Sequence, residues 1–256
     1  MSPIFLHRTA WPSAVGEPSA PHPGGAPAVS RETDSPAVVG ILALQGDVRE
    51  HAQVLTALGA RVREVRAAAD LDGLDGLVLP GGESSVIEKL ARMLGIAAAV
   101  QAAVRGGLPV YGTCAGMILL ADRIANPITG QGSFGGLDVT VARNAFGSQV
   151  RSFETELSVP PVSADPVHAV FIRAPAVLRV GEGVQVLASV PAARLEDPSL
   201  LPDGGSLASS GQVPVAVRQG SLLATSFHPE VTGDWSFHRW FLERLVLPAR
   251  GARLSR

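Results

Sequence analysis

A regular alternation of short apolar runs with amphipathic segments between residues 37 and 130 constrains the fold more than any other feature. Residues 38–44 and 76–79 are apolar throughout, which is typical of parallel strands covered on both faces. Residues 47–59 and 86–95 have apolar side chains at helical spacing and end in a glycine. Strands and helices in alternation indicate a mostly parallel sheet with helices on both faces. We therefore predict an α/β fold with three layers, α/β/α, and a mostly parallel central sheet.

The remaining predicted elements complete a single domain over residues 37–248. The next elements are strand candidates at 61–66 and 108–113 and helices at 97–105 and 115–125. After residue 130 the pattern is strand-rich, with runs at 137–143, 152–159, 168–174, 184–190, 214–219 and 221–227, and residues 235–246 predict a closing helix. Residues 195–211 are polar and turn-forming, so we expect an exposed loop there.

The two ends of the chain differ from this body. Residues 1–36 are rich in proline, glycine and serine and have neither strand nor helix periodicity. Such a segment cannot bury enough apolar surface to offset the entropy of ordering it, so we expect a disordered N-terminal tail. Residues 249–256 are expected to form a short C-terminal tail.

Composition limits the class of protein and of partner. With 46% hydrophobic and 17% charged residues the chain has enough apolar material for a core. A net charge of −2 gives no basic surface for nucleic acid or an anionic membrane. No run approaches the roughly 20 apolar residues of a membrane helix, and the N-terminus lacks a signal-peptide pattern. We expect a cytoplasmic protein without a nucleic-acid or membrane partner.

The sequence contains one cysteine, Cys114, at a predicted turn from strand to helix. A single cysteine excludes an internal disulfide and a multi-cysteine metal cluster, and we expect no metal and no cofactor. Gly112 and Gly116 flank it in the pattern Gly-x-Cys-x-Gly, the thiol counterpart of the nucleophile elbow of serine hydrolases. The N-terminus of the following helix favours a thiolate and offers N–H groups to an oxyanion. A cysteine packed as a small apolar residue under a helix gives the same local pattern.

Two further motifs lie at the ends of predicted strands. His228 and Glu230 follow the run 221–227, and in an extended segment residues i and i+2 project to the same side, so the carboxylate can orient the imidazole. Taken alone, such a pair is more often a solvated strand exit, and only the cysteine elbow in the same α/β chain reverses that preference. The segment Pro80-Gly81-Gly82-Glu83-Ser84-Ser85 follows the strand at 76–79, and ligands of open α/β sheets bind at such ends. Its glycines permit close approach of backbone to a ligand, although a glycine-rich turn with a serine cap looks the same.

The chain resembles the glutaminase subunit of pyridoxal 5′-phosphate synthase, the PdxT (Pdx2) family of class I triad glutamine amidotransferases. The resemblance extends from about residue 38 to residue 247. Its motifs are LALQGDVREH (42–51), LPGGESS (79–85), YGTCAGMILLA (111–121), ARNAFGSQVRSFE (142–154), VFIRAP (170–175) and SFHPE (226–230). The cysteine and histidine motifs are common to triad amidotransferases, and the QGDVREH, RNAFGSQVRSFE and FIRAP segments indicate this subunit.

The resemblance implies hydrolysis of L-glutamine to L-glutamate and ammonia, with the ammonia passed to a PdxS (Pdx1)-type synthase subunit for vitamin B6 biosynthesis. It implies that Cys114 is the nucleophile, His228 the base and then the acid, and Glu230 the residue that orients His228. The residues implied to bind glutamine are Gly82, Glu83, Ser84, Arg143, Ile172 and Arg173. The segment Gln45-Gly46 is expected near the active site at the partner interface.

Other charged or polar residues are expected to be structural. An arginine pair such as Arg143 and Arg173 suits an α-carboxylate, although arginines more often cover apolar neighbours at a surface. His51 is expected to be a partly exposed helix residue without a catalytic role, and His168 and His238 are expected to be structural.

Three alternatives stay open at this stage. The chain could be a glutaminase subunit of another synthase, a non-catalytic regulatory relative that has kept the fold, or a cysteine peptidase or DJ-1-like hydrolase. The complete set of Cys114, His228 and Glu230 favours an enzyme over the regulatory relative. A peptidase has no need of the glutamine-binding segments.

Overall fold

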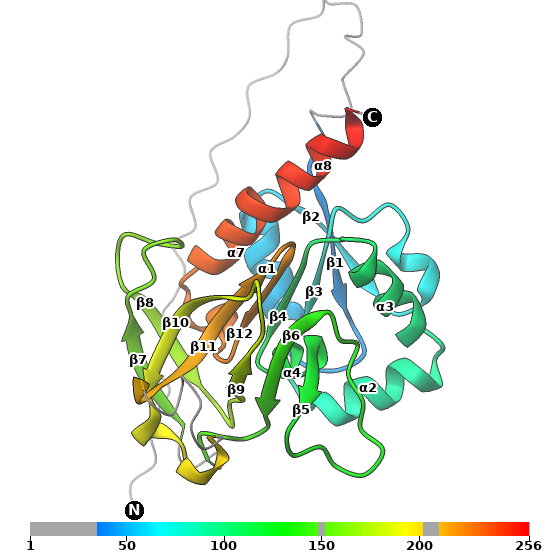
Figure 1. The fold of residues 1–256 in the computed structure, drawn as a ribbon. Helices are drawn as coiled ribbons and strands as arrows, with labels where there is room; N and C mark the ends of the chain where they lie inside the picture. The colour runs from blue at the N-terminus through cyan, green and yellow to red at the C-terminus, as the bar shows by residue number, and fades with distance from the viewer. Residues whose placement is uncertain (1–34, 148–151, 202–209, 256) are drawn as a thin grey trace, which may run out of the picture.

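The computed structural model describes residues 35–147, 152–201 and 210–255. Its central sheet has seven strands in the order β10-β11-β12-β4-β3-β1-β2 (Figure 1). In that order the strands are Gln185–Pro191, Gln212–Gln219, Leu222–Thr225, Val110–Thr113, Gly76–Leu79, Val38–Leu42 and Arg61–Val65. The five strands from β12 to β2 run parallel. At one edge β11 pairs antiparallel with β12, and β10 pairs antiparallel with β11. The predicted mostly parallel sheet is confirmed.

Helices cover both faces of this sheet, as the alternating pattern requires. On one side lie α1 (Val48–Ala57) and α7 (Ser236–Phe241), and on the other lie α2 (Ser84–Met93), α3 (Ala97–Arg105) and α4 (Ala115–Leu120) (Figure 1). Each side has its own apolar core, with Leu55 and Phe241 in one and Ile87 and Val100 in the other. The three-layer α/β/α prediction is therefore confirmed.

Two small sheets extend the domain beside the central one. One has three strands, β5 (Ala121–Ile124), β6 (Leu137–Ala142) and β9 (Ala176–Val180), and the other is a hairpin of β7 (Phe153–Leu157) and β8 (Val167–Phe171). The strand-rich character predicted after residue 130 is thus divided among three sheets, which periodicity alone does not specify. No helix among the residues described is long and apolar enough to cross a membrane.

The predicted helix over 115–125 is wrong in its second half. Helix α4 ends at Leu120, and β5 begins at Ala121 and pairs with Leu137 of β6. Gly136 N–H donates to the Asp122 carboxylate at 2.7 Å and fixes this pairing. A long-range strand partner overrides the local helical pattern of ADRIA.

The boundaries of the chain body also differ from expectation. A π-helical turn (Leu242–Val246) and helix α8 (Leu247–Leu254) continue the closing helix through residues assigned above to a C-terminal tail. In the expected loop 195–211, Leu195 is buried in the core and Pro198–Leu200 forms a 3-10 turn, while 202–209 lie outside the described residues. Residues 1–34 of the expected N-terminal tail also lie outside them, and Ser35 and Pro36 are exposed.

Candidate active site

The sharp turn at Cys114 lies between the end of β4 and the start of α4. Its backbone adopts φ 48°, in the left-handed region that residues other than glycine seldom occupy. The Cys114 N–H donates to Thr225 O of β12 at 2.8 Å, which holds the turn against the neighbouring strand. The side chain stands at the carboxyl end of the parallel strands, where open α/β sheets bind their ligands.

His228 and Glu230 approach Cys114 from the next strand of the sheet. Strand β12 ends at Thr225, and Glu230 lies in the first turn of the short helix α6 (Pro229–Thr232). The expectation of an extended i, i+2 pair is therefore wrong in backbone geometry. The two side chains still meet, because His228 Nδ1 lies 2.8 Å from Glu230 Oε1 and the Glu230 side chain is fully buried.

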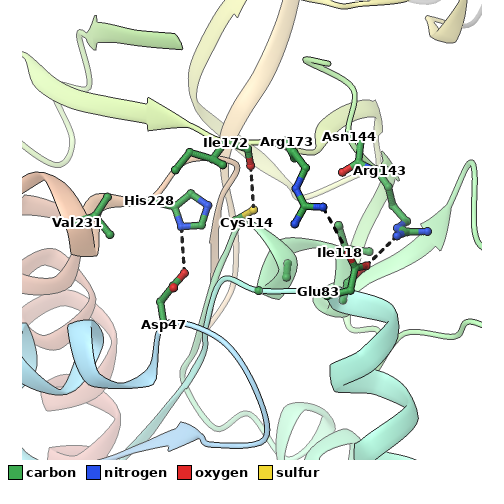
Figure 2. A pocket seen from close by; sticks show the side chains of 13 residues that line it. Asp47, Glu83, Cys114, Ile118, Arg143, Asn144, Ile172, Arg173, His228 and Val231 are labelled. Atoms are coloured by element: carbon green, nitrogen blue, oxygen red, sulfur yellow. Dashed lines mark hydrogen bonds and ion pairs between the residues drawn. The ribbon is translucent and has the colours of Figure 1, made fainter. Parts of the chain in front are cut away.

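A second carboxylate reaches the same imidazole nitrogen. Asp47, the residue before α1, places Oδ2 3.4 Å from His228 Nδ1 (Figure 2). Burial lowers the pKa of His228, but hydrogen bonds to Asp47, Cys114 and Glu230 raise it overall to about 12. Burial raises the pKa of Glu230, and the contact with His228 opposes that rise. The arrangement therefore favours an imidazolium between carboxylates on one side and the thiol on the other.

Asp47, His228 and Glu230 are also the one group among the described residues with three potential metal-ligand atoms, all within 4.8 Å of one another. The Nδ1 atom of His228 already makes its bond to Glu230. The group is fully explained as two carboxylates that share one imidazole N–H.

Eight of the nine residues predicted for the site line one cavity of about 210 Å³ (Figure 2). The ninth, Glu230, is buried outside this lining and contacts His228. The lining comprises Asp47, Gly82, Glu83, Ser84, Cys114, Ala115, Ile118, Arg143, Asn144, Ile172, Arg173, His228 and Val231. These residues come from segments far apart in the sequence that meet at one edge of the sheet. Sequence patterns named most of them, and the fold brings them together.

The charged residues of the cavity form a cluster opposite His228. Arg143 Nη2 donates to Glu83 Oε1 at 2.9 Å, and Arg173 Nη1 lies 4.0 Å from Glu83 Oε2 (Figure 2). The side-chain amide of Asn126 fixes the backbone of Arg143 through two hydrogen bonds. Its Oδ1 accepts from Arg143 N–H at 2.7 Å, and its Nδ2 donates to Arg143 O at 3.1 Å. The cavity thus offers two guanidinium groups that can bind the carboxylate of an amino acid. It also offers one carboxylate that can bind the ammonium group.

The segment Gln45-Gly46 lies against the glycine turn after β3. Gln45 Oε1 accepts from Glu83 N–H at 2.7 Å, and Asp47 N–H donates to Gly81 O at 3.1 Å. A Cβ on Gly46 would lie 1.7 Å from Gly81 O, so only glycine permits this approach. Gln45-Gly46 therefore borders the candidate site, and its expected place at the partner interface stays a prediction.

Sequence reasoning missed two residues around the site. Asp47 received no role, although an acidic residue directly after Gln45-Gly46 at the carboxyl end of β1 was a usable signal. His51 was expected to be partly exposed and is fully buried, which is a correction. His51 lies one helical turn before Leu55, so the period of α1 puts both on the inward face.

Comparisons with known proteins agree with this geometry. The model of the SNO glutamine amidotransferase family matches residues 41–247. The pyridoxal 5′-phosphate synthase subunit PdxT of Clavibacter sepedonicus is 57% identical over 206 residues, which cover 80% of this chain and 90% of that protein. The subunit of the same name from Leifsonia xyli subsp. xyli is 55% identical over 207 residues, covering 81% and 95%.

Solved structures give the same result. A crystal structure of a glutamine amidotransferase superimposes with a TM-score of 0.68 at 47% identity, covering 81% of this chain and 98% of that one. A glutamine amidotransferase from Thermotoga maritima, with a TM-score of 0.50 and 14% identity over 86% of this chain and 92% of its own, shows the shared fold alone. The resemblance seen in the motifs is confirmed, and the chain belongs to the SNO glutamine amidotransferase family.

Proposed function

We propose that this protein hydrolyses L-glutamine to L-glutamate and ammonia with Cys114, His228 and Glu230, and passes the ammonia to a pyridoxal 5′-phosphate synthase partner. One observation carries the chemistry. The chain's one cysteine stands at a left-handed elbow in the same cavity as His228, and the far nitrogen of that ring bonds a buried carboxylate at 2.8 Å. This is the arrangement that a thiol nucleophile requires.

The first half of the reaction forms a thioester. His228 holds the proton given up by Cys114 as an imidazolium, and the thiolate attacks the γ-carboxamide carbon of glutamine. The C–N bond then breaks, His228 gives its proton to the leaving nitrogen, and ammonia departs. Glu230 keeps the ring oriented and stabilises its positive charge throughout.

The second half regenerates the enzyme with one water molecule. His228 takes a proton from the water, the oxygen attacks the thioester carbon, and the C–S bond breaks to release glutamate. The N–H of Ala115, the first residue of α4, is the oxyanion donor by its position directly after the nucleophile. The Gly82–Ser84 turn contributes further contacts to the substrate from the opposite wall of the cavity.

The charged cluster supplies recognition of the amino-acid end of glutamine. Arg143 and Arg173 bind the α-carboxylate, and Glu83 accepts from the α-ammonium group. Glu83 contacts both arginines, so it exchanges partners when the substrate binds. Ile172, whose carbonyl oxygen lies 4.0 Å from Cys114 Sγ, borders the side chain of the substrate.

The choice of partner rests on the relatives. Two of them carry the name pyridoxal 5′-phosphate synthase subunit PdxT at 57% and 55% identity, and this chain spans 90% and 95% of their lengths. At such identity over nearly the whole domain we assign the same synthase partner to this chain.

The deciding experiment measures glutamate release from glutamine by the purified protein, alone and with the pyridoxal 5′-phosphate synthase subunit. We expect the partner to increase the rate, and Cys114→Ala to abolish turnover while glutamine binding persists. Wild-type rates in Cys114→Ala would refute the nucleophile. Stimulation by a different amidotransferase synthase, but not by this one, would refute the partner.

Substitutions at His228 and Glu230 test the other two triad positions, and we expect losses of kcat of different size. His228→Asn is expected to lose several orders of magnitude in kcat, because proton transfer to and from the leaving amine fails. Glu230→Gln is expected to lose less, because the amide can still orient the ring without stabilising its charge. The matched control is His168→Ala, a histidine of the β7–β8 hairpin outside the cavity, and its rate should equal that of wild type.

A further inference from the structure

Two buried histidines lie behind Glu230, on the side away from the cavity. His51 of α1 and His238 of α7 are both fully buried, and His51 Nδ1 lies 2.8 Å from His238 Nε2. The other nitrogen of His51, Nε2, lies 3.0 Å from Thr113 Oγ1 and 3.7 Å from Glu230 Oε1. The reaction as described above uses neither histidine.

Both rings are neutral at physiological pH. Burial lowers the pKa of His51 well below its usual value, and the electrostatic interactions with His238 and His228 lower it further. Burial lowers the pKa of His238 to about 3. Each ring therefore has one N–H and one lone pair, and the contacts decide which nitrogen holds the proton.

The contacts favour one tautomer pair. His238 Nδ1 is buried and has no hydrogen-bond partner among the residues described. A proton there would be a buried unsatisfied donor, so His238 holds its proton on Nε2 and donates to His51 Nδ1. His51 then has its N–H on Nε2, directed at Thr113 and the Glu230 carboxylate. The opposite tautomer would point a lone pair at the carboxylate.

Glu230 has few other groups that stabilise its charge. Its Oε2 atom is buried and without a partner in the described part of the chain, so Oε1 makes the contacts to His228 and His51. Among titratable neighbours, His228 favours the ionised carboxylate and Asp47 disfavours it. Tyr111 is a neutral phenol because burial raises its pKa. Asp234 acts on the pKa values of Tyr111 and His238.

We propose that His51 is a positioning residue that holds Glu230 ionised and directed at His228, with its own tautomer fixed by His238. This inference rests on the triad proposed above. Because the same N–H contacts Thr113, the residue before Cys114, His51 also ties the third triad residue to the nucleophile turn. Its contact to Glu230, at 3.7 Å, is an N–H dipole facing a carboxylate and not a full hydrogen bond.

The test compares His51→Asn with His51→Gln. The amide of asparagine reaches the position of Nδ1 and can bond His238, whereas the amide of glutamine reaches the position of Nε2 and can donate to Glu230. We expect His51→Asn to lower kcat about tenfold with KM unchanged. We also expect the midpoint of the acidic limb of the pH–kcat profile to rise by about one pH unit. This midpoint rises because Glu230, without the N–H of His51 beside its carboxylate, is protonated at a higher pH. His51→Gln should restore both values.

A second readout does not depend on turnover. Because the chain has one cysteine, alkylation by iodoacetamide reports Cys114 alone. We measure the alkylation rate as a function of pH. The midpoint, the pH at which this rate is half-maximal on the acidic side, should be higher in His51→Asn than in wild type, and should return to the wild-type value in His51→Gln. Leu55→Ala, which removes a buried side chain one turn further along α1, is the control for a loss of stability and should leave the midpoint unchanged.

An unshifted limb and midpoint in folded His51→Asn, or the same shift in Leu55→Ala, would overturn the positioning role. Failure of the wild-type protein with its synthase partner to release glutamate would instead count against the proposed function. The two failures are therefore distinguishable.

Discussion

The turn at Cys114, the proposed nucleophile, shows how single residues constrain the site. Cys114 adopts φ 48°, and the glycines around it leave the space that this turn needs. A Cβ on Gly116 would lie 2.0 Å from Leu79 O, and a Cβ on Gly112 would lie 2.5 Å from the Gly116 carbonyl. Strand β3, strand β4 and helix α4 therefore touch through backbone at this point, and the Gly-x-Cys-x-Gly pattern follows from the geometry.

We predict that Gly116→Ala destabilises the protein by about 3 kcal/mol or more, because the clash is with backbone and cannot be relieved by a rotamer change. Chemical denaturation measures the free energy of unfolding. The control is Gly251→Ala in α8, where a Cβ meets nothing within 4 Å, and helix propensity predicts a stabilisation of up to about 1 kcal/mol. Equal effects of the two changes would contradict the steric explanation.

Among the secondary-structure elements, the β7–β8 hairpin supports His228, the proposed catalytic histidine, from outside the main sheet. Val170 O of β8 accepts from His228 N–H at 3.1 Å. Phe153 and Phe171 pair across the hairpin and stack at 4.5 Å between ring centroids. On the exposed face, His168 bonds Glu156 at 2.8 Å and Glu154 at 2.9 Å. The hairpin thus has an aromatic inner face and a charged outer one.

The outer face gives a pH-dependent prediction. The bond to Glu156 raises the pKa of His168, with burial opposing slightly and Glu154 adding to the rise. Because the folded pKa lies above the unfolded value, this stabilisation is fully present below the usual histidine pKa and is lost as pH rises through the folded one. His168→Gln should therefore lower the free energy of unfolding more at pH 5.5 than at pH 8.5, by less than about 1 kcal/mol for an exposed pair. A larger loss at pH 8.5 would contradict this sign.

At the scale of the whole molecule, the C-terminal helix is joined to the start of the sheet through one carboxylate. Asp75, just before β3, is buried and accepts from Val38 N–H at 2.8 Å and from Arg253 of α8. Arg253 also donates to Leu74 O at 3.0 Å, and Arg250 Nε lies 3.7 Å from Asp75. These contacts explain why residues expected to be a tail continue as helix.

We predict that Asp75→Ala costs about 2–3 kcal/mol of unfolding free energy, because it leaves the Val38 N–H and the Arg253 guanidinium without their acceptor. In a double-mutant cycle with Arg253→Ala the two losses should not add, with a coupling of about 1 kcal/mol or more. Arg49→Ala, whose side chain is 82% exposed, is the control and should change stability by less than about 0.5 kcal/mol. Additive losses would show that α8 is held by other contacts.

The layered α/β fold, the parallel strands and the elbow cysteine follow from the amino-acid sequence alone, because each depends on local periodicity or on a short motif. The bounds of β3 and α3 agree with the pattern to the residue. The family resemblance predicted eight of the residues that line one cavity, because each of them lies in a short contiguous motif.

Other features of the protein depend on long-range packing, which the local sequence pattern does not encode. Strand β5 replaces half of a predicted helix because its partner, β6, follows a loop of a dozen residues. His51 lies behind Glu230 because α1 and α6 pack together, although the two residues are far apart in the sequence. Asp47 reaches His228 for a similar reason, since the parallel strands β1 and β12 both end at the same edge of the sheet, although β3 and β4 lie between them. Contacts of this kind depend on how the elements pack, and periodicity specifies only which face of an element is buried.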